Sequence, residues 1–221
     1  MISIYILKAN TLNADALMSE PSLFPFGEKE KSRLLAINNS SYRLESLGGL
    51  TALEQLCRIS GYDGKLEIVR DISGKPRFAE NGAPSFGISH SQSVSAAALC
   101  KDGELGFDIE VIDENYDTDG IAKRFFTKEE QDRLSISEDK VSNFFLIWTA
   151  KEARAKLSGK GLSALISHND TISDIHKWGN LIELDGKRIA IALCSYKKID
   201  NVKIYIYGEE DNGRQELQNR T

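Results

Sequence analysis

Residues 85–112 decide the fold class, and they read SFGISHSQSVSAAALCKDGELGFDIEVI. The short apolar runs in this stretch indicate strands at 85–88, 94–100 and 105–112. Ser89-His90-Ser91 forms a polar break between the first two runs, and Lys101–Glu104 is typical of a hairpin connection. Parallel neighbours need a crossover of about a dozen residues or more, so connections this short indicate antiparallel pairing. We therefore expect an α+β protein with mainly antiparallel sheets.

Outside this stretch, helical and extended patterns alternate. Leucines at 44, 47, 50, 53 and 56 predict a helix over Ser40–Cys57, with a weak middle at Gly48-Gly49. Thr127 and Glu130 have capping-box spacing and predict a short helix, and a longer helix is predicted from about Asp139 to Ser158, ending at Gly159. Further strands are predicted at 2–7, 65–69, 181–184, 188–194 and 202–207.

Composition narrows the class of protein. The chain has 221 residues, of which 41% are hydrophobic and 28% charged, which fits one domain or two small lobes and excludes a disordered, collagen-like or coiled-coil protein. The net charge of −5 argues against broad electrostatic capture of nucleic acid or of an anionic membrane, so an anion site must be local. Because we find no signal peptide and no apolar run long enough to cross a bilayer, we expect a cytoplasmic protein.

The segment Gly106-Phe-Asp-Ile-Glu110 is the most informative for chemistry. In a strand, residues i and i+2 share a face, so Asp108 and Glu110 project together while Phe107 and Ile109 face the core. Two neighbouring carboxylates form a hard-oxygen site that suits Mg²⁺. The alternative is an ordinary solvent-exposed face of an antiparallel strand.

A second group lies on the longest predicted helix. Glu152 and Lys156 are four residues apart and share a face, with Trp148 one turn earlier. Because Trp148 should mark a buried stripe, Glu152 is expected at the interior or in a cleft. Lys151, Arg154, Lys156 and Lys160 together form a possible polyphosphate contact, although Lys151 and Arg154 also fit a solvated basic face. The third feature is His90, whose imidazole and flanking hydroxyls could bind phosphate oxygens or only satisfy a turn.

In order and spacing, these segments resemble the signature of Sfp-type 4′-phosphopantetheinyl transferases. The matching pieces, over about residues 74–163, are Gly74-Lys75-Pro76, Phe86-Gly-Ile-Ser-His-Ser91, Gly106-Phe-Asp-Ile-Glu110, Phe125-Phe126 and Trp148-x-x-Lys-Glu-Ala153-x-x-Lys156-x-x-Gly-x-Gly161. The resemblance implies two similar lobes related by a pseudo-two-fold axis, each with a small, mainly antiparallel sheet and helices, and coenzyme A in the cleft between them. We place the lobes at residues 1–103 and 104–207, followed by a polar, frayed tail at 208–221.

The resemblance also implies roles for single residues. Asp108, Glu110 and Glu152 would hold Mg²⁺ on the pyrophosphate of coenzyme A, and Lys156 would contact a phosphate and neutralise the leaving group. The residues implied to line the nucleotide and its phosphates are Lys75, Pro76, Ser89 and His90. A looser match, to the family's basic helix and the arginine after it, adds Lys31, Arg33 and Arg43. Glu28 stands where relatives often have a second lysine.

The implied activity is Mg²⁺-dependent transfer of 4′-phosphopantetheine from coenzyme A to a serine of an apo acyl or peptidyl carrier protein, with release of adenosine 3′,5′-bisphosphate. Either Glu152 or a metal-organised water would accept the serine proton. We expect a monomer with no nucleic-acid or membrane partner. The alternatives are a non-catalytic coenzyme A or carrier-binding protein, and a metal-dependent nuclease, which the acidic charge balance disfavours.

Overall fold

The computed structural model describes residues 1–13, 24–161, 175–208 and 215–216. Its elements, in chain order, are β1 (Ile2–Lys8), η1 (Ala9–Thr11), α2 (Glu28–Leu35), α3 (Ser40–Ser60), β2 (Ile68–Arg70), β3 (Pro76–Phe78), β4 (Ser85–Ser91), β5 (Val94–Cys100), β6 (Leu105–Val111), α4 (Thr118–Phe125), α5 (Lys128–Ser135), α6 (Lys140–Ser158), β7 (His176–Leu184), β8 (Lys187–Ser195), β9 (Val202–Ile206) and β10 (Gln215–Glu216). The predicted frayed tail lies mostly outside the described residues, as do residues 162 and 163 at the end of the family motif. None of the described helices is long and apolar enough to cross a membrane.

The described strands form two larger sheets and one small hairpin sheet. The first has the order β10-β9-β1-β5-β4, the second β6-β8-β7, and the hairpin is β2-β3. Every pair is antiparallel except β1 and β9, which run parallel. The predicted α+β class with mainly antiparallel pairing is therefore confirmed. β9 comes from near the end of the chain and pairs with the first strand.

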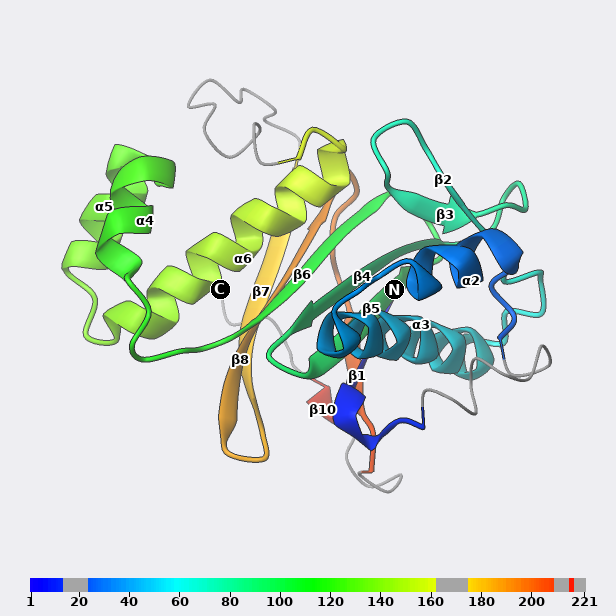
Figure 1. Cartoon of the computed structure of the whole chain (residues 1–221). Coiled ribbons are helices and arrows are strands. Elements are labelled where there is room, and N and C mark those ends of the chain that lie inside the picture. Colours follow the sequence, from blue (N-terminus) through cyan, green and yellow to red (C-terminus); the bar gives the residue numbers. More distant parts are fainter. Residues whose placement is uncertain (14–23, 162–174, 209–214, 217–221) are drawn as a thin grey trace.

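The two larger sheets meet where β4 lies beside β6 (Figure 1). At one end the backbone N–H of Leu105 donates to Ser85 Oγ (3.2 Å), and at the other that of Val111 donates to Ser91 Oγ (3.1 Å). The two strands run in the same direction, since both positions advance together along the chain. Serine hydroxyls of β4 thus satisfy backbone donors of β6. We call this pair of strands the seam.

The seam corrects two sequence-based expectations. Ser89-His90-Ser91 is not a break after a strand but the last part of β4, and the turn follows at Gln92-Ser93, where φ is 46° and 69°. The hydroxyls that make this segment look like a loop are the groups that bond to β6. Lys101–Glu104 does not close a hairpin either, because β5 pairs with β1 and β4 whereas β6 pairs with β8.

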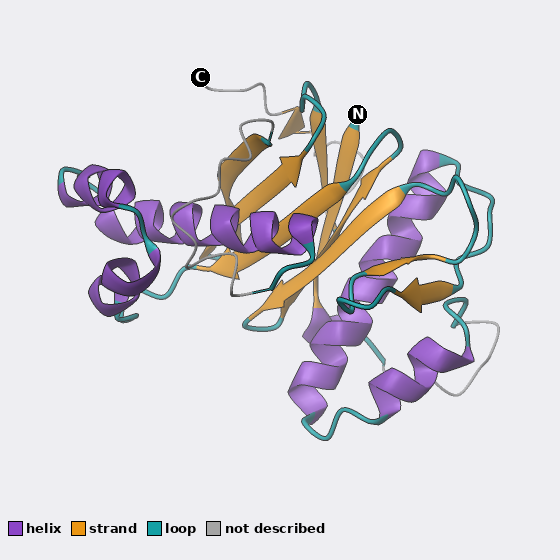
Figure 2. Cartoon of the chain, turned by 90° about the horizontal axis from the view of Figure 1, so that it is seen from above, coloured by secondary structure: helices purple, strands orange, loops and turns teal. Residues whose placement is uncertain are grey.

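The main core lies between the two larger sheets. Alternate side chains of the first sheet, such as Ile4 and Ala96, meet alternate side chains of the second, such as Phe107 and Ile191. The residues in between, such as Ala97, face away from this core and pack under α3, and their counterparts on β8 pack under α6. The helices therefore cover the outer faces and flank the seam, and Figure 2 shows them in two separate groups.

Glycines allow both long helices to approach the sheets closely. A Cβ on Gly49 would lie 2.2 Å from Ile88 Cγ2, and one on Gly48 would lie 2.6 Å from Ser95 Oγ. A Cβ on Gly106 of β6 would lie only 1.9 Å from the carbonyl oxygen of Ala153 on α6. Gly48 and Gly49, expected only to weaken their helix, are therefore required for packing α3 onto the first sheet.

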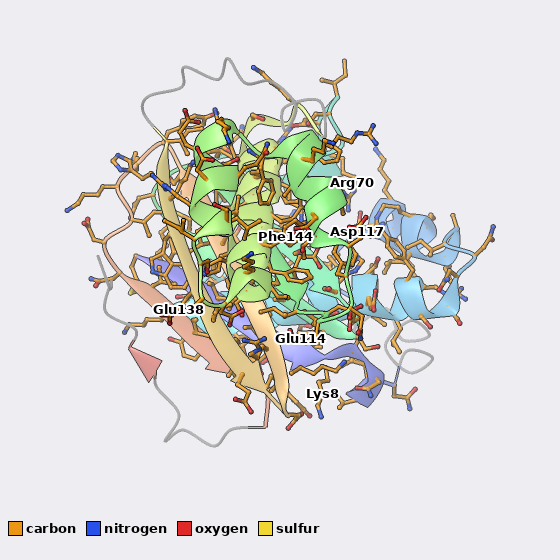
Figure 3. All side chains as sticks on the ribbon, turned by 90° about the vertical axis from the view of Figure 1, so that its left-hand side faces the viewer. Lys8, Arg70, Glu114, Asp117, Glu138 and Phe144 are labelled. Carbon is orange, nitrogen blue, oxygen red and sulfur yellow. The ribbon has the colours of Figure 1, made fainter. Side chains whose placement is uncertain are left out.

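The helix ends follow the sequence signals. Asp139 caps α6 by accepting from the N–H of Ser142, Gly159 ends it with φ 66°, and the predicted capping box of Thr127 and Glu130 opens α5. α4, which was not predicted although Asp117 caps its start by accepting from the N–H of Gly120, precedes α5. Phe144 lies in the middle of the α4–α6 group (Figure 3), stacked on Phe126 with ring centroids 5.2 Å apart.

Two strands differ in extent from their predictions. The strand expected at 65–69 is shorter and later, because only Ile68–Arg70 pairs with β3. The strand expected at 181–184 begins earlier, at His176, because β7 pairs with the whole length of β8. In both strands the first and last residues are set by pairing with a neighbouring strand. The local pattern of apolar residues does not set them.

Candidate functional site

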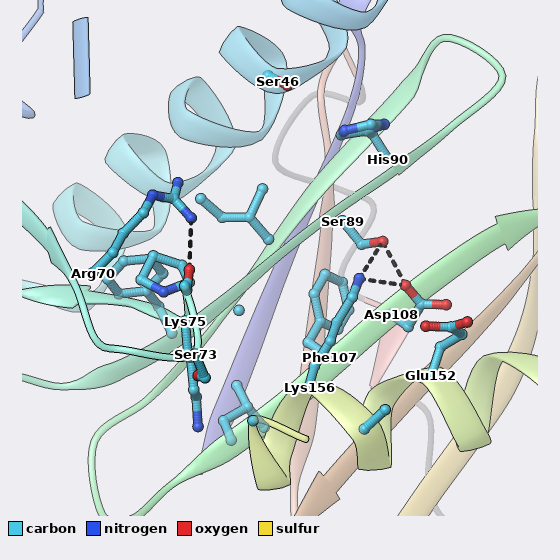
Figure 4. Close-up of a pocket in the computed structure, with 18 of the residues that line it drawn as sticks. Ser46, Arg70, Ser73, Lys75, Ser89, His90, Phe107, Asp108, Glu152 and Lys156 are labelled. Carbon is cyan, nitrogen blue, oxygen red and sulfur yellow. Dashed lines mark hydrogen bonds and ion pairs between the residues drawn. The ribbon is translucent and has the colours of Figure 1, made fainter. Parts of the chain in front are cut away.

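A cleft of about 560 Å³ lies along the seam, between α3 and α6. Its lining comes from five parts of the fold: α2, α3, the β2–β3 hairpin, the two seam strands and α6. Charged groups gather on two opposite sides of it (Figure 4). We call Asp108, Glu110, Glu152 and Lys156 the carboxylate side, and Arg33 and Arg70 the guanidinium side.

Asp108 and Lys156 form the centre of the carboxylate side. Lys156 Nζ donates to Asp108 Oδ1 (2.6 Å) and to Ser89 Oγ (3.0 Å), and Ser89 Oγ also donates to Asp108 Oδ1 (2.6 Å). Asp108 is buried, as are Phe107 and Ile109 on the opposite face of the strand. The predicted alternation is confirmed, and the solvent-exposed alternative is wrong for Asp108 because α6 covers that face.

The other two carboxyl groups carry raised pKa values. Burial, followed by repulsion from Asp108, raises the pKa of Glu110 to about 7, although Ser91 Oγ donates to it at 2.7 Å. Burial and then Asp108 also raise the pKa of Glu152. Both shifts have the same physical cause: several carboxylates share one poorly solvated place, which disfavours their charged forms.

The donor set of the carboxylate side fits a hard divalent cation. Asp108 Oδ2 is buried and has no hydrogen-bond partner among the described residues. A cation there would satisfy that oxygen and relieve the repulsion that raises the pKa of Glu110, and carboxylate oxygens are the protein ligands that Mg²⁺ takes. Among the described residues no three acidic, His or Cys side chains are gathered closely enough to form a metal site, and Lys156 is the cation bound to Asp108. Asp108, Glu110 and Glu152 are the residues that could hold a metal.

On the opposite side, the β2–β3 hairpin brings cations to the cleft. Arg70 Nη1 donates to the carbonyl of Gly74 (3.0 Å), which fixes the turn that carries Lys75. Lys75 Nζ donates to Glu104 Oε2 (2.7 Å) and to the carbonyl of Leu157 near the end of α6 (3.3 Å). Lys75 thus links the hairpin to α6 at one end of the cleft.

His90 lies on the α3 side of the cleft. Its Nδ1 is 3.1 Å from Glu45 Oε2, and its ring meets Tyr42 edge to face at 4.8 Å. Burial lowers the pKa of His90, and Glu45 opposes that shift. Glu45 is itself held by the backbone N–H of Ser93 (2.6 Å). The imidazole is therefore positioned by α3 and by the turn after β4.

Most of the residues expected from the sequence come together here. Of those candidates, the ones that line the cleft are Arg33, Lys75, Pro76, Ser89, His90, Asp108, Glu110, Glu152 and Lys156. Lys31 and Arg43 do not line it. Sequence reasoning missed Glu30 and Arg70, because no motif or spacing marks either residue and only the packing of the hairpin against α2 joins them.

The basic cluster expected on α6 does not act as one surface. Lys156 lines the cleft, but Lys151 Nζ is bound to Glu130 Oε2 of α5 at 2.7 Å and lies 5.7 Å from the ring centre of Phe126. Lys151 therefore fastens α5 to α6. Neither the polyphosphate contact nor the solvated basic face considered for Lys151 fits, because its ammonium is paired with Glu130 and its side chain is only 14% exposed.

Residues 104–207 match the family model described as the 4′-phosphopantetheinyl transferase superfamily. The segment is therefore similar to that superfamily over just under half of the chain. All four members of the carboxylate side lie within the matched segment. Both arginines of the guanidinium side, and Lys75, Ser89 and His90, precede it.

Individual proteins named 4′-phosphopantetheinyl transferase are similar over a comparable length of the chain. The 4′-phosphopantetheinyl transferase HetI of a Nostoc species is 36% identical over 108 residues, which are 46% of this chain and 45% of the relative. The 4′-phosphopantetheinyl transferase AcpT of Salmonella typhimurium is 32% identical over 108 residues, 48% of this chain and 56% of the relative. The 4′-phosphopantetheinyl transferase psf-1 of Bacillus pumilus is 41% identical over 93 residues, 41% and 39% of the two chains. The chain thus spans only about half the length of the relatives it matches.

Proposed function

We propose that this protein transfers the 4′-phosphopantetheine group of coenzyme A to a serine of an apo acyl or peptidyl carrier protein, with Mg²⁺. The observation that carries the proposal is the convergence of Asp108 and Glu110 from β6 with Glu152 and Lys156 from α6 on one cleft. Names of the relatives support the reaction, and the oxygen-only donor set with a buried, unpartnered Asp108 Oδ2 supports the metal.

In the proposed reaction the serine oxygen forms a bond to the phosphorus that bears pantetheine. The bond from that phosphorus to the bridging oxygen of the pyrophosphate breaks, and adenosine 3′,5′-bisphosphate leaves. When bound by Asp108, Glu110 and Glu152, Mg²⁺ would neutralise charge on the two phosphates. Phosphoryl transfer needs mainly positioning and charge stabilisation, and the cleft residues supply both.

Lys156 is the residue we assign to the leaving group. Two of its three ammonium donors go to Asp108 and Ser89, and its side chain is 40% exposed, so it can also reach an anion in the cleft. Asp108 and Ser89 hold the ammonium in place before the substrate binds. Its positive charge would then stabilise the negative charge that develops on the departing phosphate.

Glu152 is the group we assign to accept the serine proton. It lies on the same helix as Lys156, one turn away, and would take the proton either directly, when not bound to the metal, or through a water that the metal organises. Among the other residues that line the cleft, Lys75, Pro76, Ser89 and His90 are those we assign to the nucleotide and its phosphates.

For the carrier protein we propose docking near residues 121–160. This segment holds nine Lys or Arg against six Asp or Glu, whereas residues 101–120 hold eight acidic residues against one Lys. Carrier proteins of this kind are generally acidic, so the basic segment is the complementary one. Arg124 is exposed there, over the ring of Phe125.

The test is the intact mass of an apo acyl carrier protein after incubation with this protein, coenzyme A and Mg²⁺. We expect a gain of one phosphopantetheine group that is lost when the metal is chelated. Binding of coenzyme A without any mass gain on several apo carriers would instead indicate a non-catalytic binding protein. Absence of both binding and transfer would overturn the proposal.

A further inference from the structure

The seam places serines of one sheet against carboxylates of the other. β4 and β6 lie side by side but belong to different sheets (Figure 1). Ser89 and Ser91 are two residues apart on β4, and they donate to Asp108 (2.6 Å) and Glu110 (2.7 Å), which are two residues apart on β6. Each of the two carboxylates of β6 that could hold a metal is therefore bonded to a serine of the first sheet.

The hydroxyl of Ser91 has a second partner that fixes its direction. Its oxygen accepts from the backbone N–H of Val111 (3.1 Å), and its hydrogen goes to Glu110 Oε2. A serine hydroxyl has only one hydrogen, so the bond accepted from β6 leaves that hydrogen for the carboxylate. Because the N–H of Val111 belongs to a strand, the position of the hydroxyl is set by the backbone.

We propose that Ser91 is a positioning residue for the metal, because it holds Glu110 Oε2 and leaves Oε1 for the cation. The inference rests on the proposed function. Ser91 itself does not line the cleft, so it acts through Glu110. The segment Phe86–Ser91 contains this serine without indicating its role, since only the seam brings it to β6.

Glu110 needs such a partner because of its surroundings. Its side chain is half-buried and is repelled by Asp108 and Glu152. A glutamate side chain is flexible, and ordering it on metal binding costs conformational entropy. The hydrogen bond from Ser91 orders the carboxylate before the cation binds. Removal of such an outer partner typically weakens metal binding or activity by about 10–100-fold.

The experiment measures metal affinity directly, with Mn²⁺ as the probe. Mn²⁺ is titrated into protein that carries coenzyme A, with the protein in excess, and the unbound ion is followed by its electron paramagnetic resonance signal. Coenzyme A alone is the reference. We expect Ser91→Ala to raise the dissociation constant of Mn²⁺ about tenfold or more. Affinity for coenzyme A in the presence of a chelator should not change, because Ser91 does not line the cleft.

Ser85→Ala is the matched control on the same strand. Ser85 Oγ accepts from the backbone N–H of Leu105 at the other end of the seam, and among the described residues it bonds to no carboxylate. Each alanine variant leaves one N–H of β6 without its acceptor, so both should lower the melting temperature. Only Ser91→Ala should weaken Mn²⁺ binding.

A double-mutant cycle tests whether Ser91 acts through Glu110. Glu110→Gln should itself weaken Mn²⁺ binding, because a ligand is lost. In that background Ser91→Ala should cause no further loss, since the carboxylate that it positions is gone. A full additional loss would show that Ser91 affects the metal by another route, and the inference would be wrong.

Two other results would also overturn the inference and leave the proposed function standing. These are unchanged Mn²⁺ affinity in Ser91→Ala, and an equal loss of affinity in Ser85→Ala, which would assign the effect to the seam as a whole. If the wild type with coenzyme A binds Mn²⁺ no more tightly than coenzyme A alone, the metal of the proposed function is refuted, and the role of Ser91 with it.

Discussion

The two charged sides of the cleft are built in different ways. On the carboxylate side, regular elements supply every group: two residues of β6 and two of α6, with serines of β4 as hydrogen-bond donors. On the guanidinium side, Glu30 and Arg33 come from one turn of the short helix α2, and Arg70 comes from a small hairpin. The carboxylate side is built from strands and a helix that form the core, whereas the guanidinium side is built from a short helix and a small hairpin at its edge.

This difference predicts different sensitivities. Asp108 is buried beneath a helix whose backbone lies against Gly106, so changes there should disturb chemistry and stability together. Arg70 is one-third exposed and belongs to a hairpin with few partners, so changes there should disturb folding less. The following predictions test that contrast in order of decreasing effect.

The largest effect is expected for Lys156→Ala. The rate of carrier modification should fall by about 10²–10³-fold, as when one preorganised donor to developing charge is removed. Loss of the ammonium also leaves Asp108 without its cation, so the melting temperature of the metal-free protein should drop. A time course of the carrier's intact mass measures the rate. Lys198→Ala, at an exposed lysine that does not line the cleft, is the control, and an equal loss of rate there would refute a specific role for Lys156.

Gly106→Ala should lower the free energy of unfolding by about 3 kcal/mol, at the upper end of the usual cost of overpacking. The added Cβ would lie 1.9 Å from the carbonyl oxygen of Ala153 and 2.7 Å from Leu157 Cβ, so α6 must move away from β6. Urea denaturation measures the change.

Gly179→Ala is the matched control in β7 of the same sheet, since its Cβ would find no atom nearer than 3.4 Å. We expect little change in that variant. Equal stability of the two variants would mean that α6 does not depend on close contact at Gly106.

Glu110 should make the stability of the metal-free protein depend on pH. Its pKa is raised from the ordinary value of 4.5 to about 7, so in that window the folded state keeps a proton that the unfolded state has released. The contribution of Glu110 to the free energy of unfolding should therefore be highest below about pH 4.5. It should fall by roughly 2–3 kcal/mol as pH rises through 7.

Chemical denaturation between pH 5 and 8 in the presence of a chelator measures this slope, and Glu110→Gln should flatten it. Added Mg²⁺ should stabilise the wild type most at the upper end of the range, where Glu110 is ionised. A slope that persists unchanged in Glu110→Gln would contradict the assignment.

The smallest effect on stability is expected for Arg70→Gln, about 1–2 kcal/mol, because the buried Glu30 loses hydrogen bonds from Arg70 but keeps Arg33 as a partner. Thermal unfolding measures it. A loss as large as that of Gly106→Ala would mean that the guanidinium side is as much a part of the packing as the carboxylate side.

Much of the carboxylate side could be predicted because its spacing is local. In the strand β6, Asp108 and Glu110 are two residues apart and therefore share a face. In the helix α6, Glu152 and Lys156 are four residues apart and therefore also share a face. The signals for helix ends are equally local, as the caps of α6 at Asp139 and Gly159 show. The resemblance to a known family, carried by the same residues, joined the two elements into one site.

Other features depend on distant neighbours and could not be predicted. The segment Ser89–Ser91 looks like a loop by composition, and it becomes strand because its hydroxyls bond to β6 across the seam. Gly48 and Gly49 look like defects in a helix, and they are contact points with the first sheet. The pairing of Glu30 with Arg70 joins residues forty positions apart with no pattern to indicate it.

By itself the sequence determined the faces of β6 and α6, which follow from the short periods of a strand and a helix, and the α+β class with mainly antiparallel pairing, which follows from short connections between strands. The resemblance to a known family grouped the residues of the carboxylate side. Only the tertiary structure decided which cations face the cleft. Arg33 and Arg70 line it while Lys31 and Arg43 do not, since long side chains on short elements are directed by what packs beside them, here a single buried carboxylate on α2.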